Sequence, residues 1–168
     1  LNDYYGKKRK AKKLVIDKIQ KTVLNDIKKL SDNELFLMGT MLYWAEGFKS
    51  KSEHRLGFCN SDPNMILFYI KWLKNCLHIR PKEITLRLTL NYSYKNKVSE
   101  IEELWSKILK LPRNQFTKPF FQKTKWLKNY ANKEQYHGVL RVHVRKSVKL
   151  LWKILASIDR VKELMLKK

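Results

Sequence analysis

The segment from Glu34 to Glu46 constrains the fold most, because its side chains are apolar on every side of a helix. Ser31 followed three residues later by Glu34 is a capping box and predicts a helix start. The helix should run over residues 35–45 and end at Gly47. A helix that is apolar all round must be buried all round, which predicts core packing on one flank and a second subunit on the other.

Glu46 stands at the C-terminal end of this helix, where a carboxylate meets the negative end of the helix dipole. The placement is unfavourable by about 0.3 to 1 kcal/mol. One interpretation is an ion pair with a lysine, worth about 0 to 1 kcal/mol. In a symmetric dimer two copies of Glu46 would lie together, and at about 6 Å and an effective dielectric constant of about 20 they would repel by about 3 kcal/mol. Mg²⁺, which prefers carboxylate, water and phosphate oxygens, would reverse that sign, so a Mg²⁺ site is the second interpretation.

Three segments alternate between apolar and polar residues with the period of a β-strand: Arg55–Asn60, Ile84–Tyr92 and Gly138–Arg145. In the second segment the predicted inward residues are Ile84, Leu86, Leu88, Leu90 and Tyr92, and the predicted outward residues are Thr85, Arg87, Thr89 and Asn91. With helical segments between them, the strands predict an α+β fold. The expected sheet is antiparallel, with helices on its apolar face and polar side chains on the other.

The N-terminal region combines a basic block with an amphipathic helix. Residues Lys7–Lys13, KKRKAKK, could be an arm on phosphates, a localisation signal or the solvated start of a helix. Apolar residues then recur every three or four positions and predict a helix over residues 14–30. They are Ile16, Ile19, Val23, Ile27 and Leu30. The predicted organisation is a basic arm and amphipathic helix over residues 1–30 and a single domain over residues 31–168.

Capping residues and apolar spacing predict three further helices. Asp62 as N-cap and Pro63 as first helical residue predict a helix that extends to about Leu77. Residues 98–111 predict another, and the last is predicted to begin after Ser147. Residues 115–135 include Pro119 and predict a loop with a short strand and a helical turn.

The chain has 37 Lys and Arg residues against 15 Asp and Glu residues, a formal net charge of +22. Such an excess resists compaction unless a polyanion neutralises it, and nucleic acid is the leading partner. An anionic membrane is the rival, but no apolar run reaches the roughly 18 residues of a spanning helix and no signal peptide opens the chain. We therefore expect a cytoplasmic, nucleoid-associated protein. Cys59 and Cys76 lack CxxC spacing and are expected to be buried free thiols rather than zinc ligands.

The outward face of the sheet is cationic, and this favours DNA recognition over an ordinary solvated surface. Strands can enter the major groove, where arginine reads guanine and asparagine reads adenine while lysines hold phosphates. The candidate DNA contacts are Lys49, Lys51, Arg55, Asn60, Arg87, Thr89, Asn91, Arg141, His143 and Arg145.

Three stretches, LMGTMLYWAEG, FKSKSEHRLGF and FCNSDPNMI, together resemble the LAGLIDADG homing endonuclease superfamily. Through LYWAEG and NSDP the chain is more narrowly similar to a group of small prokaryotic proteins with one such motif per chain. The resemblance implies a LAGLIDADG-like fold with a saddle-shaped sheet on double-stranded DNA, and a homodimer joined through the Glu34–Glu46 helix. It also implies that Glu46 holds Mg²⁺ and that Asp62 orients water near the scissile phosphate, although the N-cap is the rival role for Asp62.

The sequence departs from the family pattern at several points. Met41 stands where the motif commonly has a small residue, so the dimer seam is expected to be wider or shifted toward Gly39. The helix over residues 98–111 is extra to the minimal domain, as is the N-terminal helix. A basic residue that family members often contribute near the metal has no evident counterpart here.

Three functions follow as hypotheses. The first is a homodimeric, Mg²⁺-dependent endonuclease that makes site-specific double-strand breaks, with metal-activated water attacking the phosphodiester. The second is a relative that has lost cleavage and acts as a DNA-binding transcriptional regulator. The third is an RNA maturase whose aromatic residues stack on bases, with Phe116, Phe120, Phe121 and Trp126 as candidates.

Overall fold

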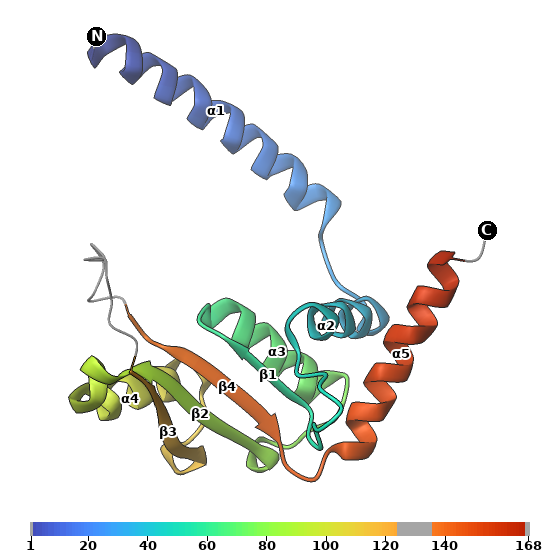
Figure 1. The fold of residues 1–168 in the computed structure, drawn as a ribbon. Coiled ribbons are helices and arrows are strands. Elements are labelled where there is room, and N and C mark those ends of the chain that lie inside the picture. The colour runs from blue at the N-terminus through green and yellow to red at the C-terminus, as the bar shows by residue number, and fades with distance from the viewer. Residues whose placement is uncertain (1, 124–135, 167–168) are drawn as a thin grey trace. The chain divides into compact units, whose positions relative to one another are not determined.

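The computed structural model describes residues 2–123 and 136–166, with side chains from Tyr4 onward. The chain divides into two compact units, Leu1–Glu34 and Leu35–Lys168. The described part is α+β and contains five α-helices and a four-stranded sheet (Figure 1). The helices are α1 (Asn2–Asp26), α2 (Asp32–Glu46), α3 (Pro63–Asn75), α4 (Val98–Leu109) and α5 (Val148–Leu166). The strands are β1 (Gly57–Asn60), β2 (Ile84–Asn91), β3 (Phe116–Gln122) and β4 (Val139–Val144), and short 3₁₀ helices occupy Pro81–Glu83 (η1), Tyr92–Lys97 (η2) and Arg113–Gln115 (η3).

The sheet has the strand order β1-β4-β2-β3 and is mixed. Strand β4 runs antiparallel to both β1 and β2, whereas β3 runs parallel to β2. The prediction of a wholly antiparallel sheet is therefore wrong at the β3 edge. The reason is the connection through α4, because a helix between two strands returns the chain to the same end of the sheet and permits parallel pairing.

Strand β3 occupies part of the segment predicted to be a loop. Pro119 lies within it, at a point where the register with β2 shifts between Arg87 and Thr89. Proline has no N–H to donate, and an edge strand with a local irregularity is where a sheet tolerates it. The predicted short strand is thus confirmed as the seven residues Phe116–Gln122, and residues 124–135 of the same predicted segment lie outside the described residues.

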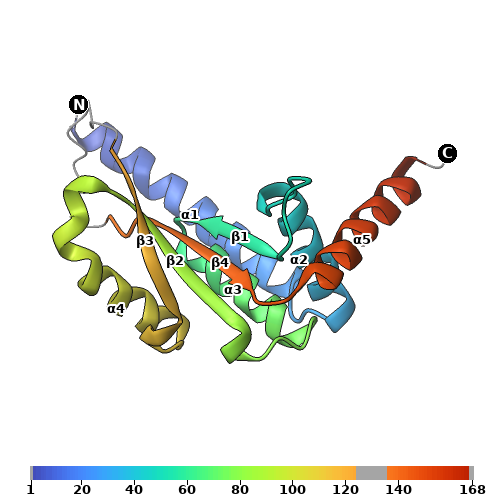
Figure 2. The same cartoon turned by 60° about the horizontal axis from the view of Figure 1, so that its bottom comes forward.

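The core lies between the sheet and the helices on one of its faces, and Figure 2 shows α3 and α4 on that side. The predicted inward residues Ile84, Leu86, Leu88 and Leu90 are all fully buried, as are Leu140 and Val142 of β4. They pack in one cluster with Ile66, Tyr69, Trp72 and Leu73 of α3 and with Ile101 and Trp105 of α4. The inward position predicted for Tyr92 is wrong, because β2 ends at Asn91 and Tyr92 begins η2 with half of its surface exposed.

Helix α2 begins with the predicted capping box. The amide of Glu34 donates to Ser31 Oγ at 3.3 Å, and the amide of Ser31 donates to Glu34 Oε2 at 2.7 Å. Farther along, Trp72 Nε1 donates to the carbonyl of Phe36 at 3.2 Å, and a Cβ on Gly39 would lie 2.1 Å from Trp72 Cδ1. Gly39 is therefore the point of close approach between α2 and α3. Gly39 thus faces the core of the chain, and the expectation of a wider or shifted dimer seam stays a prediction.

Only one side of α2 is buried within the chain. Leu35, Gly39, Thr40 and Tyr43 are buried, as the inner half of the prediction required. On the other side Leu37, Met38 and Trp44 are exposed by 40%, 46% and 37%. The prediction of burial all round is thus met on one flank, and the opposite flank presents apolar side chains to solvent.

Helix α1 is longer toward the N-terminus than predicted. It begins at Asn2 rather than at residue 14, so the basic block is helical, and it ends at Asp26. Its apolar residues Ile16, Ile19 and Val23 are exposed. None of the helices in the described ranges combines the length and apolar character needed to cross a membrane.

Helix α5 begins directly after Ser147, as predicted, but the Ser147 hydroxyl also links two strand ends. It accepts a hydrogen bond from the amide of Leu56 at 2.8 Å and donates to the carbonyl of Val144 at 2.7 Å. This buried bridge joins the entry of β1 to the end of β4. Cys59 and Cys76 are free thiols, as expected, but both are only partly buried.

Candidate nucleic-acid interface

A row of side chains crosses all four strands on the face opposite the core. Register pairs Cys59 of β1 with Arg141 of β4, Arg141 with Arg87 of β2, and Arg87 with Thr117 of β3. Residues directly opposite each other on neighbouring strands point to the same side of a sheet, and like charges so placed destabilise it. The guanidinium groups of Arg87 and Arg141 therefore repel each other in the free chain. An anion or an electronegative ligand bound between them would remove this repulsion.

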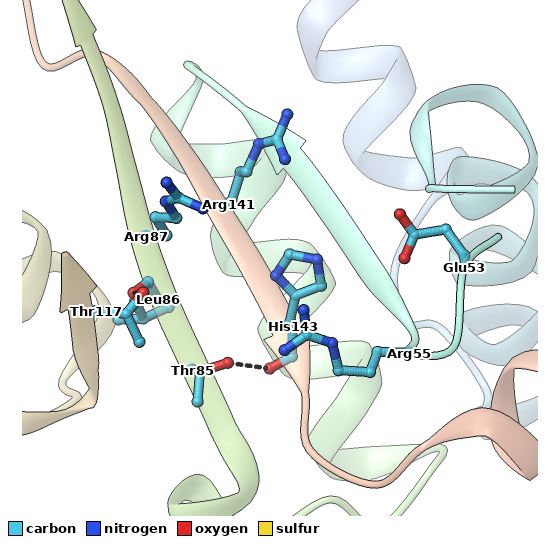
Figure 3. Close-up of a pocket in the computed structure, with 8 residues that line it drawn as sticks. All are labelled: Glu53, Arg55, Thr85, Leu86, Arg87, Thr117, Arg141 and His143. Carbon is cyan, nitrogen blue, oxygen red and sulfur yellow. Dashed lines mark hydrogen bonds between the residues drawn. The ribbon is translucent and has the colours of Figure 1, made fainter. Parts of the chain in front are cut away.

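The two arginines line a hollow of about 340 Å³ on this face. The residues around it are Glu53, Arg55, Thr85, Leu86, Arg87, Thr117, Arg141 and His143 (Figure 3). They come from β2, β3, β4 and the loop before β1. Four of the predicted DNA contacts, Arg55, Arg87, Arg141 and His143, thus meet at one place. Three arginines and a single acid make the hollow strongly cationic.

Three polar residues of the hollow, Glu53, Thr85 and Thr117, are not among the predicted DNA contacts. Thr85 has the outward parity of β2 and could have been included on that signal. Thr117 lies on β3, which was not predicted as a full strand. Glu53 lies in an irregular loop, and nothing in its sequence context indicates that it lines the same hollow as the three arginines.

His143 is held neutral by its surroundings. Burial lowers its pKa from 6.5 to about 4, and the guanidinium groups of Arg55, Arg141 and Arg87 act in the same direction. Its ring lies 5.3 Å from that of Phe48, and its carbonyl accepts a hydrogen bond from Thr85 Oγ1 at 3.4 Å (Figure 3). At neutral pH His143 is therefore a polar group without charge, able to hydrogen-bond a base but not to act as a cation.

Each of the two facing arginines rests on an aromatic ring. The guanidinium carbon of Arg141 lies 5.1 Å from the centre of the Phe48 ring, and that of Arg87 lies 5.7 Å from the centre of the Phe120 ring. Such contacts are cation–π interactions, and they hold the guanidinium plane while leaving its N–H edge free. The hollow therefore presents oriented hydrogen-bond donors rather than freely rotating charges.

Two predicted contacts do not reach this surface. Thr89 and Asn91 are only 8% and 6% exposed, so their predicted outward exposure is wrong. Thr89 pairs with Phe120 of β3, the strand that the sequence did not predict in full. Asn91 turns its side chain into the start of η2, where Oδ1 accepts hydrogen bonds from the amide and the hydroxyl of Ser93 at 3.0 and 2.8 Å.

Four further predicted contacts lie outside the residues that line the hollow. Lys49 and Lys51 are exposed in the loop after α2, and Lys49 Nζ donates to the carbonyl of Gly47 at 2.8 Å. Arg145 is exposed in the turn after β4. Asn60 is partly buried and its Oδ1 accepts the amide of Asp62 at 2.8 Å. Of the aromatic residues proposed to stack on RNA bases, Trp126 lies outside the described residues, and Phe120 is 49% exposed on β3.

Glu46 is the last residue of α2 and its side chain is exposed. The next residue, Gly47, forms an isolated β-bridge with Phe58, so the end of α2 is attached to β1. Burial raises the pKa of the neighbouring Cys59 thiol, while Arg141 lowers it and Glu46 raises it. The carboxylate and Arg141 are therefore both within electrostatic reach of one thiol at this side of the sheet. Across residues 4–123 and 136–166 no lysine or arginine forms an ion pair with Glu46, so the lysine pair, one of the two interpretations of its placement, is not observed there.

Asp62 is the N-cap of α3, as predicted. Its Oδ1 accepts the amide of Asn64 at 2.8 Å, and Pro63 occupies the first turn. The structural role is confirmed, and it engages one of the two carboxylate oxygens. The water-orienting role that the family resemblance implies stays a prediction.

The described residues of one chain contain no group of three or more His, Cys, Asp or Glu side chains that could hold a metal ion. Glu46 supplies one carboxylate, which is the donor that Mg²⁺ prefers but is too little for a complete site. The donor set fits Mg²⁺ only if a second copy of the chain contributes its own Glu46. A comparison with protein-family models, curated proteins and solved structures finds no match.

Proposed function

We propose that the chain is a DNA-binding protein that acts as a homodimeric, Mg²⁺-dependent endonuclease of the LAGLIDADG type. The observation that carries the proposal is the Glu46 carboxylate, which is exposed, forms no ion pair among the described residues and stands at the end of α2 beside β1, the strand whose Cys59 faces Arg141. An acid in this position weakens DNA binding by repelling phosphate. A binding module gains nothing evident from it, whereas a nuclease requires it.

Duplex DNA is the ligand that best matches the hollow. Arginine forks form paired hydrogen bonds with guanine O6 and N7 in the major groove, and Arg87 and Arg141 are held with their donors free. Glu53 could accept a hydrogen bond from cytosine N4, and Thr85 and Thr117 could contact a thymine methyl group. Lys49, Lys51 and Arg145, which lie in exposed turns and loops outside the hollow, are placed to neutralise phosphates.

The exposed side of α2 supports the proposed homodimer. Leu37, Met38, Met41 and Trp44 follow one another at helical spacing on that side, and Leu37 and Met38 are well exposed, while Lys162 of α5 covers one face of the Trp44 ring at 5.3 Å. A contiguous apolar patch of this kind typically marks an interaction site, and a two-fold axis through α2 would let the patch cover its own copy. The same axis would bring together the two Glu46 carboxylates at the helix ends.

Glu46 from each chain would hold the metal in this arrangement. Bound Mg²⁺ would supply a Lewis acid at the phosphodiester and lower the pKa of water. The arginines of the hollow would fix the register of the duplex, so that one phosphate of each strand lies by the carboxylates. The Asp62 oxygen that does not cap α3 stays available to accept a hydrogen bond from water.

A DNA-binding regulator without cleavage activity is the second candidate. It is favoured by the engagement of Asp62 as an N-cap and by the single carboxylate that one chain presents. Such a protein would retain the arginine hollow and its sequence preference, and it would bind DNA with or without Mg²⁺.

The test is selection of cleaved sites from a random DNA library in Mg²⁺, compared with Ca²⁺, for the wild-type chain and Glu46→Gln. We expect cleavage by the wild type only in Mg²⁺, and a reduction of about 100- to 1,000-fold in Glu46→Gln with site binding retained, the size typical of removing a group that stabilises the transition state electrostatically. Glu100→Gln, which removes an exposed acid from α4, is the matched control and should cleave normally. Equal cleavage by Glu46→Gln would refute the metal role, and site-specific binding without cleavage by any variant would establish the regulator.

A further inference from the structure

The basic block Lys7–Lys13 forms part of α1 and is not used by the proposed function. Lys7, Lys8, Arg9, Lys10, Lys12 and Lys13 are all exposed, and Ala11 is the one uncharged residue among them. Successive residues of an α-helix are rotated by about 100°, so six cations in seven positions point to all sides of the helix. No acid lies within the block. This segment is therefore a rod with positive charge around its whole circumference.

Such a rod is under internal repulsion when it is helical. Lys8 and Lys12 are four residues apart, as are Arg9 and Lys13, and residues at this spacing are neighbours on the helix surface. Like charges at these positions oppose helix formation. A polyanion that surrounds the block removes this repulsion, so helix and ligand stabilise each other.

The distribution of charge distinguishes between the possible polyanions. A membrane is flat and meets one side of a helix, and an interfacial helix needs an apolar face opposite its charged one. The block itself contains only Ala11, and the apolar residues of α1 that follow it, Leu14, Val15 and Ile16, begin only after its last cation. The major groove of duplex DNA is about 12 Å wide, close to the 10–12 Å diameter of a helix with its side chains, and it has a phosphate backbone on each side.

We propose that residues Lys7–Lys13 of α1 are a second DNA-binding element, which lies in the major groove and contacts phosphates on both of its edges. The element belongs to the first compact unit, Leu1–Glu34, and uses neither the arginine hollow nor Glu46. It takes from the proposed function only the choice of duplex DNA as ligand. Because phosphate contacts carry no sequence information, the element increases affinity for every duplex equally.

The experiment uses the full chain and compares two variants that each remove six positive charges. In the first, the six basic residues of the block are replaced by glutamine, which has nearly the same helix propensity as lysine. The matched control replaces six exposed lysines outside the block and the sheet with glutamine: Lys71, Lys74, Lys82, Lys107, Lys149 and Lys153. Circular dichroism confirms that both variants keep their helices. The readout is the affinity for a random-sequence duplex, measured by fluorescence anisotropy over a range of salt concentrations.

We expect the affinity of the block variant at low salt to fall by about tenfold or more. Its plot of log affinity against log salt should become shallower by about 0.9 for each phosphate that the chain no longer neutralises, whereas the control should keep the wild-type slope. Equal slopes for the two variants would overturn the proposal, because a general reduction of charge would then explain the result. Weaker binding to vesicles that contain phosphatidylserine, with DNA binding unchanged, would overturn it in favour of a membrane.

The result is separable from the test of the proposed function. If the wild type neither cleaves DNA nor prefers any sequence, but the block variant still shows the shallower slope, the proposed function fails and the second element stands. If the wild type cleaves a specific site and the block variant keeps the wild-type salt dependence of its affinity, the proposed function stands and the second element fails.

Discussion

Two regions of the chain concentrate positive charge, and they present it in different ways. In the basic block the cations are mostly lysines on an exposed helix, and no acid stands among them. In the hollow on the sheet the cations are arginines, two of them on strands and resting on Phe48 and Phe120, with Glu53 beside them. Mobile point charges suit phosphates, and oriented forks suit base edges. The difference indicates that one region serves affinity and the other serves specificity.

The largest expected effect comes from the arginines. Arg87→Gln combined with Arg141→Gln should reduce the preference for the selected site by about 100-fold, because each paired arginine–guanine contact contributes about 1–3 kcal/mol of discrimination. Competition binding against random duplex measures the effect. Lys71→Gln with Lys74→Gln is the charge-matched control. A double arginine variant that kept its site preference would show that the hollow does not provide the sequence specificity.

The next effect is a dependence of the folding stability on pH that arises from one residue of the sheet, His143. His143 has a pKa of about 4 in the folded chain against 6.5 when unperturbed, so the folded state binds its proton less readily than the unfolded state. The stability from the neutral ring is fully present above pH 6.5 and is lost as the pH falls toward 4. The shift corresponds to about 3 kcal/mol before solvent screening and to about 1–2 kcal/mol after it. Urea unfolding at pH 7 and pH 5 should show this decrease, and His143→Gln should reduce it.

The smallest effect concerns the aromatic support of Arg87. Phe120→Leu removes the ring below the guanidinium and should weaken site preference by about 0.5–1 kcal/mol, a few-fold in relative affinity, with little change for random duplex. Phe120→Tyr keeps the ring and should restore the preference. Phe121→Leu is the neighbouring control, because the Phe121 ring packs against Tyr92 rather than an arginine. An equal decrease of preference in both leucine variants would mean that β3 is merely destabilised.

The parts of the fold that depend on local pattern could be predicted from the sequence. The capping box at Ser31 and Glu34, the N-cap at Asp62 and the buried leucines of β2 each follow from residues within a few positions of one another. Gly39 shows the limit of this reasoning. Because α2 is apolar on all sides, its sequence cannot tell which side meets α3, and the choice is made by Trp72, more than thirty residues away.

Site residues could be predicted where their position follows from the alternation of inward and outward residues along a strand. They could not be predicted where their position depends on other elements that pack beside them. Arg87, Arg141 and His143 alternate with buried residues, so their shared face could be inferred. The burial of Thr89 depends on β3, whose parallel pairing with β2 follows from the α4 connection and is hidden by Pro119. The position of Glu53 depends on the path of an irregular loop, which no periodicity encodes.

The contact between Gly39 and Trp72 also has a consequence for how α2 meets other molecules. Because the indole fills the notch left by the glycine, α2 cannot roll about its own axis without lifting away from α3. The rotation of the helix about its axis is thereby fixed, and Leu37 and Met38 point outward before any encounter, while Lys162 of α5 lies over the ring of Trp44. A partner that binds this side of α2 would meet a surface whose shape is already formed. Its association rate constant should therefore be that of rigid-body docking rather than of binding coupled to folding.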